Sequence, residues 1–511
     1  MQTNYRRATL VKPKKRMSDE QIRAIHEGSL QILNDPGVTC FNEHAADLYD
    51  KAGCKVTRAD EGKNVWNVKI TPQVIQETLT NIPEQVILGA RNPDNKLLLD
   101  AEVPNVYFGT GSETNVFLKT EIKEYVSQDD SSKTMLYPEF IEERGSLKNL
   151  CTSAKLCNNL ENVDFFIRNV NIQDEDITLE NKDVNVFMAA LMYMTKHVQA
   201  GVVDLSQLDQ IIKMGEIIAG GKKEFKDNPL LSFITCVIKS PLQMVEDTTE
   251  KLITIAQKGV PVVISSSPQG GSTAPIQEEG IVSLINAEIL AGIALAQIVN
   301  PGTPVLYGAV PVRARLDTLH DLYGAPEFIH YNADCIQMAR HYGVPCYSSA
   351  GVGDAKVPGM QATIEKVFAQ LEVAAAGAQY IHYAFGLLDK TNVFCPLQAV
   401  LDDAHVGKIR DMLRQPVFNE KDVADTAGQI KHTLTSSTKL FARYIRKARR
   451  KGLVTEPYPF ESEEGKDEVL VKAHNRLEEI LGSDGEKLDP ASVDEIYKNI
   501  PGLLPRERFE L

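Results

Sequence analysis

The side chains of this chain that could do chemistry are mostly neutral or aromatic. They lie at or just after the ends of short apolar runs: Thr110, Asn169, Asn171, Thr235, Cys236, 265–267, Tyr307, Ser348, Ser349, His382 and Tyr383. No HxH or HExxH pattern and no cluster of acidic residues and histidines has the spacing of metal ligands. No GxSxG turn presents a nucleophilic serine either. The sequence therefore argues against a metal hydrolase and against serine nucleophilic catalysis.

Aromatic rings in this set could hold a cation without neutralising it. The faces of Tyr and Phe attract quaternary ammonium groups by about 0.5–2 kcal/mol per ring when water is excluded. Candidate rings are Tyr107, Phe108, Tyr137, Tyr307, Tyr347, Tyr383 and Phe385. Packing in the core is the alternative for each of them. Arg313 and Arg315 could pair with a substrate carboxylate, or could lie in a solvated loop with Asp317.

The elements that must position these residues alternate between strand and helix. Apolar strands are predicted at 106–109, 165–170, 198–203, 231–237, 261–266, 304–309, 344–349 and 380–385. Helical stretches separate most of them, notably 206–219, 242–258, 280–297, 326–342 and 361–376. This alternation predicts an α/β fold with a (β/α)8 TIM barrel over 105–410. A doubly wound sheet is the alternative, but GTGSET at 109–114 is not a GxGxxG fingerprint.

Two further regions flank the predicted barrel. Residues 1–104 contain helical patterns at 18–34 and 42–52 and a short strand at 66–70, which indicates a mixed α/β lead-in that caps one end. Residues 411–511 are helical and charged, and we expect them to form an extension at the surface.

Composition narrows the class of protein. The chain has 511 residues, 43% of them hydrophobic, and its net charge of −14 argues against nucleic acid as a partner. The basic segment 1–16 is not followed by an apolar stretch, and no run of about 18 uncharged apolar residues suggests a membrane span. The eight cysteines are scattered, which favours a reduced, cytoplasmic protein. We also expect a homo-oligomer.

Several motifs carry a family resemblance over residues 18–446. They are GVTCFNEHAADLYDKAGCKV (37–56), FGTGSET (108–114), STAPIQEEGIVSLINAEILAGIALAQIVNPGTPVLYG (272–308), YGAPE (323–327) and the strand–loop–helix–strand unit at 344–389. On these motifs the chain resembles the trimethylamine:corrinoid methyltransferase superfamily. The resemblance implies a (β/α)8 barrel that moves a methyl group from a methylated amine to the Co(I) of a separate corrinoid protein. A cobalamin-binding DxHxxG motif is not matched, because Asp403 to Gly407 is one residue short of that spacing. The corrinoid should therefore be carried by the partner.

The resemblance also marks a departure at Val352. Trimethylamine members carry pyrrolysine at the corresponding position of the loop AGVGDAK (350–356). A tertiary amine needs such activation, whereas a quaternary ammonium compound already carries the charge and leaves as a neutral tertiary amine. Binding, desolvation and in-line orientation then suffice. Val352 therefore fits the members that demethylate glycine betaine or a related betaine, such as carnitine, proline betaine or γ-butyrobetaine.

The hypothesis assigns no residue as a nucleophile. The predicted substrate-binding residues are Tyr107, Phe108, Thr110, Tyr307, Arg313, Arg315, Ser349, Val352, His382 and Tyr383. Gly351 and Gly353, which flank Val352, are predicted to contact the corrinoid. Two alternatives stay open. Lys356 could form a Schiff base as in a class I aldolase, or the chain could be a non-catalytic betaine-binding protein.

Overall fold

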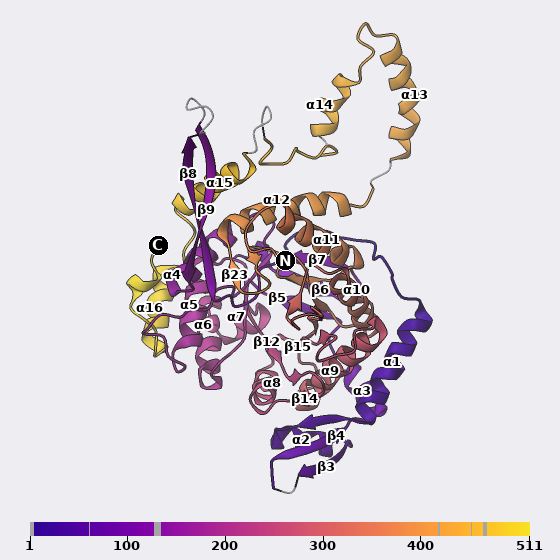
Figure 1. Cartoon of the computed structure of the whole chain (residues 1–511), viewed down its shortest axis with the longest axis vertical. Helices are drawn as coiled ribbons and strands as arrows, with labels where there is room; N and C mark the ends of the chain where they lie inside the picture. Colours follow the sequence, from indigo (N-terminus) through magenta and orange to yellow (C-terminus); the bar gives the residue numbers. More distant parts are fainter. Residues whose placement is uncertain (1–4, 61, 127–133, 417–418, 451, 463–467) are drawn as a thin grey trace.

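The centre of the molecule is a curled, mostly parallel sheet with helices packed around it (Figure 1). This computed structural model describes residues 5–60, 62–126, 134–416, 419–450, 452–462 and 468–511. The strands of the sheet are β1 (Thr9–Leu10), β7 (Asn105–Phe108), β10 (Phe165–Ile167), β11 (His197–Ala200), β12 (Leu231–Cys236), β15 (Val262–Ser266), β17 (Val305–Ala309), β20 (Cys346–Ser349) and β21 (Tyr380–His382). Their order in space is β1-β7-β21-β20-β17-β15-β12-β11-β10.

Each of the eight predicted strands is present, although several end earlier than predicted. Neighbours from β7 to β10 pair in parallel, and only β1 joins the sheet antiparallel, against β7. The two outermost parallel strands also touch each other. Gly109 forms an isolated parallel bridge with Phe165, and the Asp164 amide donates to the Phe108 carbonyl at 2.7 Å.

The helices that surround the sheet lie mostly between its strands in sequence. They are α4 (Leu147–Asn159), α5 (Lys182–Tyr193), α6 (Leu208–Ala219), α7 (Lys222–Asp227), α8 (Glu246–Lys258), α9 (Glu278–Val299), α10 (Pro326–His341), α11 (Met360–Ala376) and α12 (Pro396–Leu413). By length and composition α9 could cross a membrane, but its residues are almost all buried within this fold. Its apolar character is that of a core helix.

The lead-in covers two parts of the barrel-like body. α1 (Asp19–Asn34), α2 (Glu43–Lys51) and α3 (Pro72–Leu79) pack on α9, next to a small sheet of β2 (Val38–Cys40), β3 (Lys55–Asp60), β4 (Val65–Lys69), β13 (Ile238–Lys239) and β14 (Gln243–Met244). The hairpin β5 (Gln85–Leu88) and β6 (Leu97–Asp100) packs its buried leucines and valine against Tyr107, Phe165 and Tyr380 inside the curled sheet. This hairpin closes the interior at the end opposite the strand carboxyl ends.

Two projections leave the body on the same side (Figure 1). One is the antiparallel ribbon of β8 (Val116–Val126) and β9 (Thr134–Arg144), which the sequence patterns did not predict. The other is an arm of two helices, α13 (Glu420–Leu434) and α14 (Ala442–Arg450). The last helices, α15 (Val469–Gly482) and α16 (Pro490–Asn499), instead pack on the body and bury Leu477, Ile480 and Ile496. Short strands complete the loops: β16 (Gln269–Gly270), β18 (Val312–Ala314), β19 (Asp321–Leu322), β22 (Leu387–Leu388) and β23 (Val393–Phe394).

Candidate functional site

A cavity of about 130 Å³ lies among the carboxyl ends of the parallel strands. Its walls are formed by Ser112, Glu113, Ile167, Arg168, Ala200, Gly201, Ile234, Tyr347, His382 and Tyr383. They come from β10, β11, β12, β20 and β21 and from the segments that follow β7, β10, β11 and β21. In parallel α/β folds this edge of the sheet is where side chains from several strands meet a ligand.

One wall of the cavity is the upper end of an aromatic column inside the sheet. Phe165 stacks on Tyr380 with ring centroids 3.5 Å apart, and Tyr380 lies 5.7 Å from Tyr347. His382 continues the column at 4.2 Å from Tyr347 and 3.7 Å from Tyr383. Every second residue of a strand faces the same side, which is why Tyr380 and His382 of β21 lie in one column. The cavity is therefore bounded by faces and edges of aromatic rings.

His382 is held as a neutral ring. It is buried, its Nε2 lies 2.7 Å from the Ser349 hydroxyl, and burial lowers the pKa of the imidazole well below its usual value. The next residue, Tyr383, has a positive φ of 70°, which is rare for a non-glycine residue. Gly111 makes room for this turn, because a Cβ there would lie 2.8 Å from the Tyr383 ring. An uncharged, closely packed surface thus faces the cavity.

Another part of the cavity wall is charged. Arg168 follows β10 directly, and its Nη2 donates to Glu113 Oε2 at 2.5 Å. Lys182 lies 2.9 Å from the other oxygen of Glu113. The second guanidinium nitrogen of Arg168, Nη1, is buried and has no hydrogen-bond partner among the residues that the structure describes. Burial raises the pKa of the Asp183 carboxyl, and the nearby Arg168 charge partly opposes this rise. One strong donor on this wall is therefore unused.

The loop after β20 is fixed from behind by α11 and α12. Lys366 is fully buried, donates to the carbonyls of Gly351 and Leu387, and lies 3.1 Å from Asp402. The Glu365 carboxylate accepts from the amides of Asp354 and Ala355. Gly351 has a φ of +93°, and a Cβ there would lie 2.5 Å from Gln370 Nε2. The loop is therefore held by hydrogen bonds and close contacts from α11.

The predicted site residues divide into two groups. His382, Tyr383 and the candidate ring Tyr347 line the cavity, and Ser349 bonds to His382. The remaining predicted ring and hydroxyl residues point elsewhere. Tyr107 donates to the Arg6 carbonyl, Phe108 lies under the Arg410 guanidinium, Thr110 exchanges hydrogen bonds with the Ile167 backbone, and Tyr307 donates to Asn286 at 2.9 Å. Phe385 is buried in the core, and Tyr137 lies on the ribbon with 45% of its surface exposed.

The loop residues and cations predicted for the site also lie outside the cavity wall. Val352 is fully buried in the core that backs the loop. A Cβ at Gly353 would lie 2.6 Å from Glu365 Oε2, so a larger residue there would have to displace the Glu365 carboxylate. Arg315 forms a two-pronged pair with Asp317, both bonds being 3.1 Å, and Arg313 lies 3.7 Å from Glu327. Lys356 is exposed.

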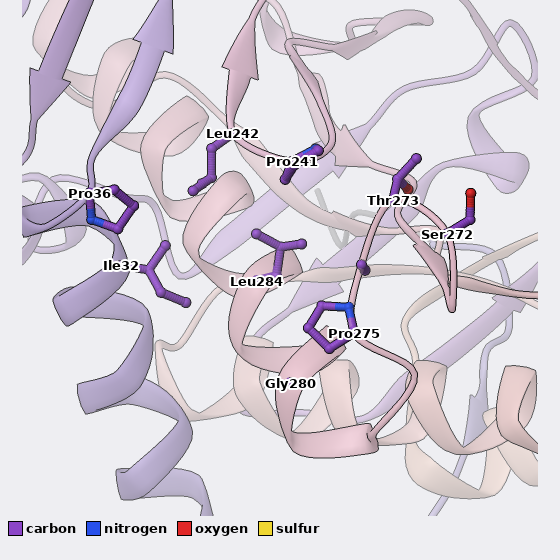
Figure 2. Close-up of a pocket in the computed structure, with 10 residues that line it drawn as sticks. Ile32, Pro36, Pro241, Leu242, Ser272, Thr273, Pro275, Gly280 and Leu284 are labelled. Atoms are coloured by element: carbon purple, nitrogen blue, oxygen red, sulfur yellow. The ribbon is translucent and has the colours of Figure 1, made fainter.

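Sequence reasoning missed Arg168, Glu113 and Ser112. The available signal was their position, because Arg168 is a charged residue within the strand predicted at 165–170 and the other two belong to the FGTGSET motif. A larger apolar groove of about 370 Å³ lies elsewhere, between α1, the segment at Pro241 and the start of α9 (Figure 2). Its wall contains no ionisable side chain, so it offers nothing to orient a charged substrate.

Comparison with known proteins identifies the family. The model of the trimethylamine methyltransferase (MTTB) family matches residues 2–130 and 139–500. The chain is 27% identical to the glycine betaine methyltransferase of Desulfitobacterium hafniense (strain Y51) over 97% of both chains. It is 28% identical to the trimethylamine methyltransferase MttB of D. hafniense (strain DSM 10664 / DCB-2), over 77% of this chain and 74% of that protein. The MttB of Methanosarcina barkeri (strain Fusaro / DSM 804) is 28% identical over 79% of this chain and 77% of its own. The chain therefore belongs to the trimethylamine methyltransferase (MTTB) family and is a methyltransferase.

Proposed function

We propose that this methyltransferase moves a methyl group from a betaine to the Co(I) of a corrinoid carried by a separate protein. The observation that carries the proposal is the mixed lining of the cavity. One part of its wall is aromatic and neutral, at Tyr347, His382 and Tyr383, and another includes Arg168, whose buried Nη1 has no hydrogen-bond partner among the described residues. A molecule with a quaternary ammonium at one end and a carboxylate at the other matches both parts. The full-length similarity to a glycine betaine methyltransferase supports the same substrate class.

The proposal includes a closed (β/α)8 barrel, with residues 1–104 as its cap and 411–511 as its extension. Closure is supported by the bridge between Gly109 and Phe165 and by the Thr110 hydroxyl, which accepts from the Ile167 amide at 2.8 Å and donates to its carbonyl at 2.7 Å. Thr110 acts in this proposal as part of the barrel wall. The cavity is then the interior of the barrel at its carboxyl-terminal mouth.

The residues of this chain act by binding and orientation. The rings of Tyr383 and His382 hold the ammonium, and Arg168 Nη1 donates to the carboxylate. A Co(I) corrinoid, when bound on its partner, supplies the nucleophile. The carbon–nitrogen bond breaks with its electron pair kept by nitrogen, so a neutral tertiary amine leaves and no proton transfer is needed. The neutral state of His382 fits this requirement, because a cationic imidazolium would repel the substrate.

Exclusion of water favours the transfer further. In the ground state the positive charge is concentrated on the ammonium, and in the transition state it is spread over the ammonium, the methyl group and the acceptor. A poorly solvated aromatic site therefore stabilises the transition state more than the ground state. The acceptor needs access from the mouth, where the side chain of Cys236, 2.8 Å from Ser265, is exposed to solvent. Gly351 and Gly353 remain our proposed neighbours of the corrinoid, in addition to their packing against α11.

A methyl-transfer assay tests the function. The full chain is incubated with reduced cob(I)alamin and, separately, with glycine betaine, carnitine, proline betaine, γ-butyrobetaine and trimethylamine. We expect methylation of the corrinoid with at least one betaine, an equivalent of tertiary amine product, and no reaction with trimethylamine. Binding of every betaine without any transfer would indicate a binding protein. Borohydride trapping of a carbonyl compound on Lys356 would instead support an aldolase; either result overturns the proposal.

A further inference from the structure

The arm formed by α13 and α14 exposes an apolar face that no other part of the described chain covers. Val423, Ile430 and Leu434 of α13 are 63%, 44% and 64% exposed, and their spacing places them on one side of the helix. The turn and α14 add Leu440, Phe441 and Ile445, each between 46% and 64% exposed. Apolar faces of this extent on a projecting element mark an interaction surface.

The charge of the arm indicates what kind of surface it meets. Residues 420–450 contain eight lysines and arginines and three acidic residues, and all three acidic residues lie in the first turns of α13, before residue 426. The arm therefore carries +5 within a chain of −14, so all other residues together carry −19. Two such arms would repel each other, whereas an acidic surface with apolar side chains would attract one.

The ribbon of β8 and β9 offers such a surface. Val126 and Leu136 in its outer half are 52% and 48% exposed, whereas Tyr125 and Met135 lie on the other face of the ribbon. Leu136 lies opposite Glu124, and Glu142 lies opposite Leu118, so both carboxylates share one face of the ribbon with Leu136. Among the described residues 120–126 and 134–142, this face carries no lysine or arginine.

We propose that the arm of one copy docks along the ribbon of a second copy of this chain. The ribbon and the arm project from the same side of the body (Figure 1), so a two-fold arrangement lets each arm meet the partner's ribbon. In such a two-fold dimer two identical contacts form, and each buries the apolar face of one arm and of one ribbon. Each contact also pairs the basic arm with an acidic ribbon, so no other molecule is needed to balance the charges. The interface lies apart from the cavity, and the proposal does not depend on the substrate.

Charge-reversal variants of the arm and of the ribbon test this pairing, with self-association of the full chain measured by analytical ultracentrifugation. Variant one carries Arg446→Glu and Arg450→Glu in the arm, and variant two carries Glu124→Lys and Glu142→Lys in the ribbon. We expect the wild type to associate and each variant alone to need at least tenfold higher concentration for association. Mixing the two variants should restore a complex of both, because each arm then meets a ribbon of opposite charge. The substitution Phe368→Asp on the exposed face of α11 is the control and should leave association unchanged.

Two results would overturn the proposal. In one, the variants associate as the wild type does, alone and mixed. In the other, the wild type is a monomer at all concentrations, and the arm variant instead loses binding to a corrinoid protein; the arm would then serve that partner. Replacing two apolar residues of the arm, Ile430→Asp and Leu434→Asp, provides a second measurement. These substitutions should weaken association without changing the far-ultraviolet circular dichroism of the protein.

Discussion

Substitution of Arg168 gives the most direct test of the proposed binding of a betaine in the cavity. Of its two terminal guanidinium nitrogens, Nη2 donates to Glu113, and Nη1 is buried with no partner in the described part of the chain. A substrate carboxylate would therefore gain one charge-assisted hydrogen bond from Nη1. Such a bond contributes about 1.5–3 kcal/mol, so Arg168→Gln should weaken betaine binding by about 10- to 150-fold. Arg168→Lys should weaken it less, because the charge remains but the planar fork is lost.

The effect should fall on KM and not on kcat. The carboxylate is remote from the carbon–nitrogen bond and has the same charge before and during transfer, so its hydrogen bond stabilises both states equally. Calorimetric titration with glycine betaine and with tetramethylammonium separates the carboxylate from the cation. We expect the substitution to reduce affinity for the first ligand and to leave affinity for the second unchanged.

Arg315→Gln is the matched control, because Arg315 is 48% exposed and already paired with Asp317. It should change neither ligand's affinity. An equal loss of affinity for tetramethylammonium in the Arg168 variants would mean that Arg168 only supports the shape of the wall through Glu113. An unchanged affinity for glycine betaine would refute the carboxylate contact.

Three further predictions concern the scaffold. Burial lowers the pKa of His197 to about 4, below its value in the unfolded chain. The folded state should therefore lose about 3 kcal/mol of stability as the pH falls from 6.5 to 4, because the unfolded chain binds the proton first. In urea unfolding, His197→Gln should show a smaller change of stability over that pH range. Lys366→Met leaves the Asp402 carboxylate buried without its cation and should cost about 3–5 kcal/mol in urea unfolding, whereas exposed Lys356→Met should cost nothing measurable. Gly109→Ala places a Cβ 2.1 Å from the Phe165 ring and should cost about 1–3 kcal/mol, unlike Gly428→Ala in α13, where nothing lies within 4 Å.

The order of strands and helices could be predicted because buried parallel strands are short, continuously apolar runs. The ribbon was missed for the opposite reason. Its outer half is exposed on both faces and alternates charged residues with Tyr125, Leu136 and Tyr137, so it has no core-facing pattern to detect. The packing of α15 and α16 on the body was likewise hidden, since only one narrow face of each charged helix is buried.

Site residues were harder to predict, because a shift of one position turns a side chain to the other face of a strand. Tyr307 was predicted for the site and points toward α9. In β7, Tyr107 lies inside the sheet but near the hairpin end, while Phe108 points outward. The sequence suggests Asn169, whereas Arg168, one residue earlier, lines the cavity. Strands that are apolar on both faces carry no pattern from which this choice can be made.

The support around Tyr383 argues that the chain holds its site by strain that is offset elsewhere. A non-glycine residue at a φ of 70° costs about 1–3 kcal/mol, and the conformation persists only if its surroundings fix it. The segment on either side of Tyr383 is fixed by α11 and α12. Gln370 donates to the Ala384 carbonyl at 2.7 Å, Asp402 accepts from the Gly386 amide at 2.8 Å, and Lys366 donates to Leu387.

The same lysine and glutamine also contact the loop that contains Val352. Lys366 donates to the Gly351 carbonyl, Gly351 packs closely on Gln370, and the Ala350 amide donates to the His382 carbonyl at 3.1 Å. One buried polar network therefore fixes both the valine loop and the strand end that carries His382 and Tyr383. Burying Lys366 and Asp402 has a desolvation cost of several kcal/mol per ion, which is hard to explain for a loop that only connects two elements. This cost is explained if the buried pair fixes the loop that holds Tyr347, His382 and Tyr383 in place. In the proposed reaction these residues bind a substrate that already carries a positive charge.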